Sequence, residues 1–169
     1  MRRHSRVAVN RTVRCHLGDA VLTPVHDIRD GEVSALAEEA SQFLLSHDWC
    51  KSVRSAHLAW AAAGVLGVFR FEIQPARPGV DELLWVVVGD LPSAYLVCEG
   101  NSTWREALEG YIYEMGRWVS AVRSGSALDD VIPTGVAPTV EHADMLEGRL
   151  GLISREILSA DAGELVSDT

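Results

Sequence analysis

The sequence has few cysteines and no long apolar run, and both shortages limit the kind of protein it can encode. Its three cysteines form no C-x-x-C pair, and an odd number argues against a disulfide framework. Since no secretory signal is recognisable, reduced thiols and a cytoplasmic location are the simpler interpretation. No apolar run approaches the roughly 20 residues that a membrane-spanning helix needs, so we expect a soluble protein that does not bind membranes.

The motifs of several common enzyme classes are also missing. The sequence contains no G-x-x-x-x-G-K-[ST] loop for phosphate, no dinucleotide-binding glycine pattern and no G-x-S-x-G nucleophile elbow. The six histidines form neither H-x-x-x-H nor H-E-x-x-H. Cys15 and His16 are adjacent but lack the two further ligands of a closed zinc site. The sequence therefore favours a protein without catalysis, and it predicts no cofactor and no metal.

Charge is divided unevenly along the chain. The first 18 residues contain five arginines and no acidic residue, so the net charge of −9 leaves −14 for residues 19–169. A body this acidic repels nucleic acid and anionic membranes and favours a basic protein partner. The alternative is that the acidity only keeps the protein soluble.

The arginine-rich start permits three interpretations. It resembles a transit peptide with a poor apolar face, or a twin-arginine signal without its apolar segment. We favour a basic, disordered tail over residues 1–18, because the charge is one-sided and the apolar residues are scattered. Residues 19–159 are then expected to form a single domain, and residues 160–169 a polar, frayed tail.

The most informative pattern is an alternating segment followed by a continuous apolar run. Residues 68–74 alternate apolar with polar side chains, which is typical of a strand with one buried face. Residues 83–88 contain no polar side chain and predict a strand covered on both faces. A Gly-Asp-Leu-Pro turn leads into a third strand over residues 94–98. We expect an α+β fold with a small antiparallel sheet of three to four strands, in which residues 83–88 are central.

Helices are predicted before and after this sheet. Asp30 can cap a helix over residues 31–46, whose apolar residues recur at three and four positions. The segment that follows stays open between two interpretations, a short helix over residues 49–54 and an edge strand over residues 57–60.

The helix after the sheet has clear boundaries. Thr103 and Glu106 form a capping box for a helix over residues 104–124, and Gly125 can end it in a left-handed conformation. A last helix is expected over residues 138–158. Glu109, Glu114 and Arg117 are expected on the solvent face of the helix over residues 104–124. Glu114 and Arg117 are one turn apart and can form an ion pair.

Four residues near the ends of neighbouring elements are candidates for a pocket or an interface: Trp85, Asp90, Tyr95 and Trp104. Asp90 is placed like a catalytic acid at a strand end, but aspartate is also a preferred turn residue, and we favour the turn. Aromatic residues in a sheet usually belong to the core. Cys50 lies near His47 and Asp48, yet we interpret it as a small buried hydrophobe rather than a reactive thiol. No catalytic residue is assigned.

One segment resembles a known group of proteins. Residues 84–95 read L-W-V-V-V-G-D-L-P-S-A-Y. This resembles the core of an uncharacterised family of small bacterial proteins with a W-V-x-x-G-D-L-P-x-x-Y pattern and a helix following it. The similarity covers roughly residues 49–123. It implies a bacterial cytosolic protein and brings no catalytic residues with it.

Two classes of function remain open. The first is an acidic protein-binding module, of inhibitor or immunity type, that masks a basic toxin or enzyme. The alternative is a small-molecule-binding protein or enzyme with a pocket between the sheet and the C-terminal helices. We also predict a twofold homodimer, because residues 83–88 need cover on both faces and the helix over residues 31–46 is short for one of them.

Overall fold

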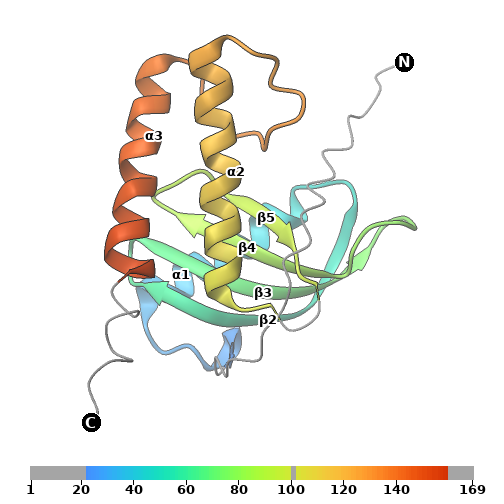
Figure 1. Cartoon of the computed structure of the whole chain (residues 1–169). Coiled ribbons are helices and arrows are strands. Elements are labelled where there is room, and N and C mark those ends of the chain that lie inside the picture. The colour runs from blue at the N-terminus through green and yellow to red at the C-terminus, as the bar shows by residue number, and fades with distance from the viewer. Residues whose placement is uncertain (1–21, 100–101, 160–169) are drawn as a thin grey trace. The chain divides into compact units, whose positions relative to one another are not determined.

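The computed structural model describes residues 22–99 and 102–159 (Figure 1). The chain divides into two compact units, the first ending at Gly110 and the second beginning at Tyr111. The tails predicted over residues 1–18 and 160–169 lie outside the described residues.

The first unit contains one antiparallel sheet of five strands in the order β1-β2-β3-β4-β5. Its elements are β1 (Thr23–Pro24), the 3₁₀ turn η1 (Val25–Asp27), α1 (Gly31–Leu45), β2 (Cys50–Ala62), β3 (Leu66–Pro75), β4 (Leu83–Gly89), β5 (Ala94–Val97) and the start of α2 (Trp104–Ser124). The predicted α+β class and the neighbouring order of β3, β4 and β5 are confirmed. The sheet has five strands, so the prediction of three to four was too low.

β2 fills the segment that the sequence left open. It is one continuous strand of 13 residues, so the short helix considered over residues 49–54 is wrong, and residues 57–60 do lie in a strand. Three register shifts against β3 interrupt it, and such bulges destroy the two-residue alternation by which a strand is recognised. β1 pairs only with His57 and Leu58 of β2. Among the residues described, β2 therefore has a second neighbour along only this short part of its length.

Both helix starts expected around the sheet are formed by side-chain caps. Asp30 Oδ1 accepts hydrogen bonds from the backbone amides of Glu32 at 2.9 Å and Val33 at 3.0 Å. Before α2, the Thr103 amide donates to Glu106 Oε2 at 2.9 Å, and the Glu106 amide donates to Thr103 Oγ1 at 3.3 Å. These bonds satisfy amides that a helix start otherwise leaves unpaired, which is why the two boundaries could be predicted.

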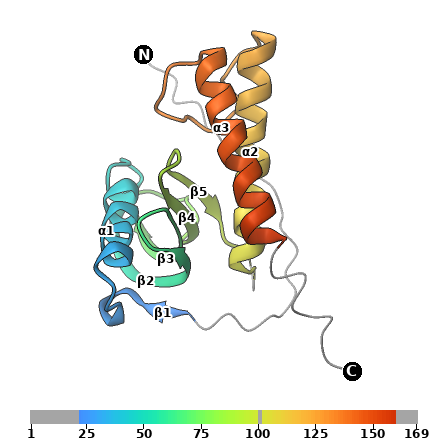
Figure 2. The same cartoon turned by 90° about the vertical axis from the view of Figure 1, so that its left-hand side faces the viewer.

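α1 covers one face of the sheet (Figures 1 and 2). Its apolar residues pack against side chains of β3 and β4 in a core formed by Leu36, Ala37, Ala40, Leu44, Cys50, Phe69, Phe71, Ile73, Leu84, Val86 and Val88. Residues 84–88 are all buried, as the continuous apolar run predicted. α1 is therefore held as a rigid layer on the sheet.

The second unit contains the rest of α2 and the helix α3 (Val140–Ile153), which continues as one turn of π-helix, η2 (Ser154–Leu158). Gly125 ends α2 with φ of +67°, and the amide of Ser126 donates to the Ala121 carbonyl at 3.0 Å. This is the left-handed cap that the sequence predicted. Thr139 caps α3 by accepting a hydrogen bond from the His142 amide at 3.2 Å.

Glu114 departs from the predicted solvent face of α2. Arg117 Nη1 donates to Glu114 Oε2 at 3.0 Å, so the expected ion pair is confirmed. Glu114 itself is only 2% exposed, and it is the one buried charged residue among those described. A buried carboxylate is costly unless it is paired, so the Arg117 guanidinium is what makes its burial tolerable.

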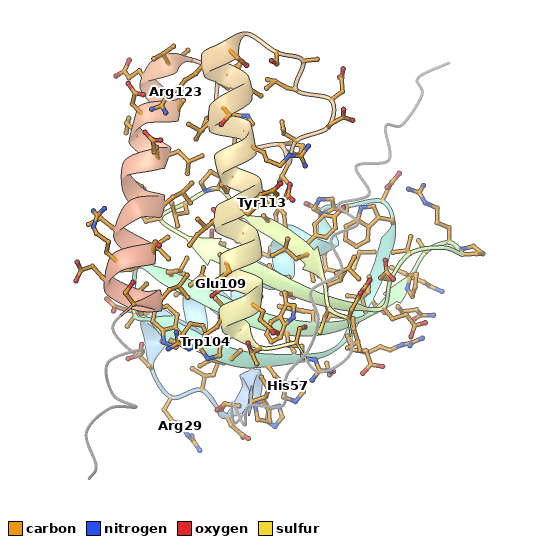
Figure 3. The ribbon with its side chains drawn as sticks, in the orientation of Figure 1. Arg29, His57, Trp104, Glu109, Tyr113 and Arg123 are labelled. Carbon is orange, nitrogen blue, oxygen red and sulfur yellow. The ribbon has the colours of Figure 1, made fainter. Side chains whose placement is uncertain are left out.

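α2 and α3 are joined by Arg123, whose Nη2 bonds the carboxylates of Asp144 and Glu147, the latter at 2.7 Å (Figure 3). The hydrogen bond from Arg123, together with its positive charge, lowers the pKa of Glu147. A folded-state pKa below the unfolded value means that the pair stabilises the fold above the unfolded pKa. That contribution is lost as the pH falls through the folded pKa.

Replacing Arg123 with alanine should therefore raise the pKa of Glu147 toward its ordinary value, as measured by an NMR titration of the side-chain carboxyl carbons. The destabilisation should be larger at neutral pH than at a pH below the folded-state pKa of Glu147, where the carboxyl is protonated with or without its partner. Arg155→Ala removes an arginine outside this cluster and should leave Glu147 unchanged. An unchanged Glu147 titration in Arg123→Ala would contradict the pairing.

Candidate functional site

The structure does not bring the four predicted site residues together, because two of them lie on opposite faces of the sheet. Trp85 is buried on the face away from α1, and its Nε1 donates to Ser102 Oγ at 2.8 Å. Tyr95 pairs across the strands with Val86 and packs against the core beneath α1. A single pocket on one face of this sheet cannot use both side chains.

The other two candidates also have separate environments. Trp104 begins α2 and stacks on Trp60, with ring centroids 5.2 Å apart and an interplanar angle of 15° (Figure 3). The Arg105 guanidinium also lies over the Trp104 ring, 4.7 Å from its centroid. Asp90 is exposed in the β4–β5 turn, where its amide donates to the Val65 carbonyl at 2.8 Å.

Tyr95 belongs to a ring cluster at the end of α1, formed by Phe43, His47, Trp49 and Tyr95. His47 is central, with centroid distances of 4.9 Å to Phe43, 4.8 Å to Trp49 and 5.5 Å to Tyr95. All four side chains are half-buried, and burial raises the pKa of the Tyr95 hydroxyl. The ring cluster therefore offers apolar aromatic surface that is still partly open to solvent.

Cys50 lies beside this cluster in sequence but has the environment of a structural residue. It is buried in the core beneath α1, and burial raises the pKa of its thiol. A reactive cysteine needs a lowered pKa, because the thiolate is the nucleophile. These observations support the interpretation of Cys50 as a small buried hydrophobe.

The solvent side of α1 and its two ends form an acidic face. Residues 30–48 contain no lysine or arginine and five exposed acids, namely Asp30, Glu32, Glu38, Glu39 and Asp48. Asp30 serves as the helix cap, and Glu32 in the first turn interacts favourably with the helix dipole. Asp48 has a cation nearby, with Arg77 Nη2 at 3.7 Å. Glu38 accepts a hydrogen bond from Gln42 Nε2 at 2.9 Å, but neither Glu38 nor Glu39 forms an ion pair with the residues described, so their charge is available to a partner.

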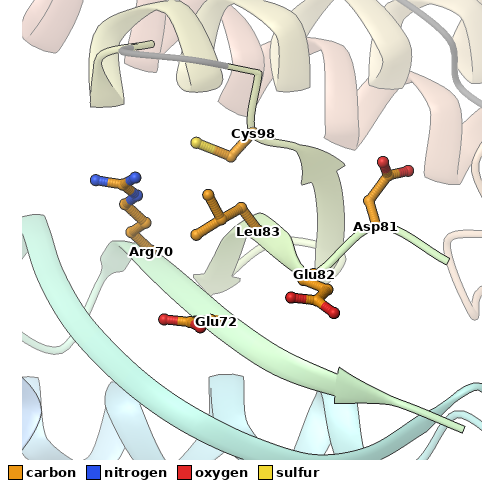
Figure 4. A pocket seen from close by; sticks show the side chains of 6 residues that line it. All are labelled: Arg70, Glu72, Asp81, Glu82, Leu83 and Cys98. Atoms are coloured by element: carbon orange, nitrogen blue, oxygen red, sulfur yellow. The ribbon is translucent and has the colours of Figure 1, made fainter.

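A hollow of about 470 Å³ lies on the opposite face of the sheet, beside the connection from β3 to β4 (Figure 4). It is lined by Arg70, Glu72, Asp81, Glu82, Leu83 and Cys98. Arg54 of β2 holds two of its carboxylates, with Nη1 3.2 Å from Glu82 Oε2 and 3.9 Å from Glu72 Oε1. None of the four residues predicted from the sequence lines this hollow.

Two absences complete the description of the site. Within the ranges that the structure describes, no three histidine, cysteine, aspartate or glutamate side chains are grouped to hold a metal ion. No helix in those same ranges combines the length and the apolar character needed to cross a bilayer.

No protein-family model matches the chain, and no curated protein and no solved structure shows significant similarity to it. The family resemblance of residues 84–95 therefore stays a prediction from the sequence.

Proposed function

We propose that the protein is an acidic protein-binding module, of inhibitor or immunity type, that holds a basic partner protein and catalyses no reaction. The acidic face of α1 carries this proposal, because it combines five exposed carboxylates with no lysine or arginine over residues 30–48. Such a one-sided field attracts a basic surface, speeds its encounter and disfavours acidic competitors.

The support beneath α1 suits this role. The buried residues of α1 lock the helix onto β3 and β4, so the carboxylates project from a rigid element. The ring cluster at the end of α1 adds aromatic surface next to Asp48. Tryptophan and tyrosine are frequent at the centre of protein interfaces, whereas exposed charges alone contribute little affinity. The acidic face then orients the partner, and the ring cluster supplies the apolar contact.

A charge reversal on α1 tests the proposal. We expect Glu38→Lys/Glu39→Lys to reduce capture of a basic protein, with a pI of about 9 or above, by tenfold or more from extracts of the native host. Wild-type protein should capture the same basic protein, and adding salt to the extract should weaken its capture. Quantitative mass spectrometry of the bound proteins is the measurement.

The matched control is Glu141→Lys/Glu156→Lys, which makes the same charge change at two exposed residues of the second unit. It should capture the partner as wild type does. If both variants lost capture of the partner equally, the effect would come from net charge alone, and α1 would not be the binding surface. Equal capture by wild type and the α1 variant would reject the proposal, as would a captured partner that is not basic.

Self-association remains a separate proposal. It was predicted because the helix over residues 31–46 is short for covering one face of residues 83–88, and the structure weakens that reason. The sheet face under α1 is already covered within one chain, since Phe71, Leu84 and Val86 are at most 2% exposed. A symmetric dimer through α1 would also bring two acidic faces together, which is unfavourable. Light scattering at micromolar concentration measures the mass directly. The cytoplasmic location, the bacterial origin and a small-molecule pocket between the sheet and the C-terminal helices likewise remain predictions.

A further inference from the structure

The hollow beside the β3–β4 connection is lined by one cation, Arg70, that no described residue pairs. Arg70 lies on β3 between Phe69 and Phe71, so its side chain is on the face away from α1. No residue in the described part of the chain forms a hydrogen bond or an ion pair with it. Its Nε is moreover buried, and it is the one buried side-chain nitrogen or oxygen there without a partner. A buried donor in this state favours any ligand that brings it an acceptor.

The same hollow is lined by one carboxylate, that of Asp81, that no described residue pairs. Glu72 and Glu82 share Arg54, but the exposed carboxylate of Asp81 has no ion pair or hydrogen bond to the residues described. Figure 4 shows Arg70 on one side of the hollow and Asp81 on the other, with the apolar side chain of Leu83 between them. The hollow thus presents at its two sides opposite charges that no described residue pairs.

The strand register places these two charges at different points along the sheet. Arg70 pairs with Trp85 and Glu72 pairs with Leu83, and Asp81 lies two residues before the start of β4. The two charged residues are therefore separated along the strand direction. A ligand that meets both must carry its own charges several ångströms apart.

We propose that this hollow binds an elongated small zwitterion, with a carboxylate at one end, an ammonium group at the other and an apolar segment between them. The ligand carboxylate accepts hydrogen bonds from Arg70, including the buried Nε–H, in the forked geometry that guanidinium groups favour. The ammonium group lies at Asp81, and the apolar segment lies on Leu83. The volume of about 470 Å³ is in the range of small-molecule sites. This site is independent of the acidic face of α1, which lies on the other side of the sheet.

A matched series of three probes tests the proposal: ε-aminocaproate carries both charges, caproate only the carboxylate and hexylamine only the ammonium group. The readout is the Arg70 Nε–H resonance in ¹⁵N NMR spectra of the full chain. We expect ε-aminocaproate to shift this resonance with a Kd of about 1 mM or lower, and each single-charge probe to bind at least tenfold more weakly.

Variants of the two charged residues separate the roles of the two ends. Asp81→Asn should weaken ε-aminocaproate at least tenfold, as followed on the Arg70 resonance. Arg70→Gln should do the same, as followed on the backbone amides of Leu83 and Cys98. Arg77→Gln, at an exposed arginine outside the hollow, should change nothing. The Asp81 variant alters an exposed side chain and keeps the test valid if Arg70→Gln fails to fold.

Three outcomes would overturn the proposal. The first is the absence of any shift at tens of millimolar probe. The second is caproate binding as tightly as ε-aminocaproate with no effect of Asp81→Asn, which would define a simple anion site. Loss of binding in Arg77→Gln would show that the probe sits elsewhere, with the same consequence.

Discussion

Replacing Phe71 with alanine should lower the free energy of unfolding by about 3 to 5 kcal/mol, the usual range for truncation of a buried aromatic side chain. Phe71 is fully buried in the core beneath α1, and its ring meets that of Phe69 at a centroid distance of 6.5 Å and an angle of 61°. Alanine removes this contact and leaves a cavity between β3 and α1. Urea unfolding followed by tryptophan fluorescence measures the change.

Val65→Ala is the matched control. Val65 precedes β3 and is 55% exposed, so its truncation should change the stability by no more than about 0.5 kcal/mol. A loss in Phe71→Ala no larger than that in Val65→Ala would show that the sheet does not rest on α1 through this ring. Hydrogen exchange of the β3 amides gives a second measure, since core strands open only with the fold.

β3 and β4 could be predicted because local pattern and tertiary environment agree. The alternation of residues 68–74 places Phe71 and Ile73 under α1 and Arg70 on the opposite face. The apolar run of residues 83–88 corresponds to a strand whose residues 84–88 are buried. Burial on a sheet follows the two-residue period of a strand, so a strand with regular pairing shows its exposure in its sequence.

β1 and most of β2 could not be predicted, for two physical reasons, and only residues 57–60 of β2 were considered as a strand. The bulges of β2 shift its register three times, so its side chains change faces without a fixed period. β1 has only two residues and exists because β2 offers it a partner. Neither the bulges nor a two-residue pairing leaves a local pattern in the sequence.

The candidate sites divide in the same way. The acidic face had a local signal, five acids and no lysine or arginine over residues 30–48, which the total charge obscured. The hollow had none, because Arg70, Asp81 and Cys98 come from separate segments that only the sheet brings together. The predicted set of Trp85, Asp90, Tyr95 and Trp104 relied on nearness to element ends. That criterion ignores which face of a strand a side chain takes.

The turn that follows β4 gives the second large effect: Gly89→Ala should cost about 3 kcal/mol or more. Gly89 has φ of +137°, a conformation that is nearly confined to glycine and costs other residues about 1 to 3 kcal/mol. A Cβ at this position would also overlap the carbonyl oxygen of Val65 and lie 2.9 Å from the Leu66 Cα. That carbonyl accepts the hydrogen bond from the Asp90 amide, so the clash displaces an acceptor that the turn uses.

Gly79→Ala separates the two causes. Gly79 also has positive φ, +84°, but a Cβ there meets nothing within 4 Å, so its cost should be only the conformational part, about 1 kcal/mol. The difference between the two variants, measured by urea unfolding, then contains the cost of moving the Val65 carbonyl together with the difference in cost between the two φ angles. If both variants lose the same free energy of unfolding, a methyl group fits at the end of β4 without displacing the Val65 carbonyl. The glycine of the Gly-Asp-Leu-Pro turn would then be required for its φ angle alone.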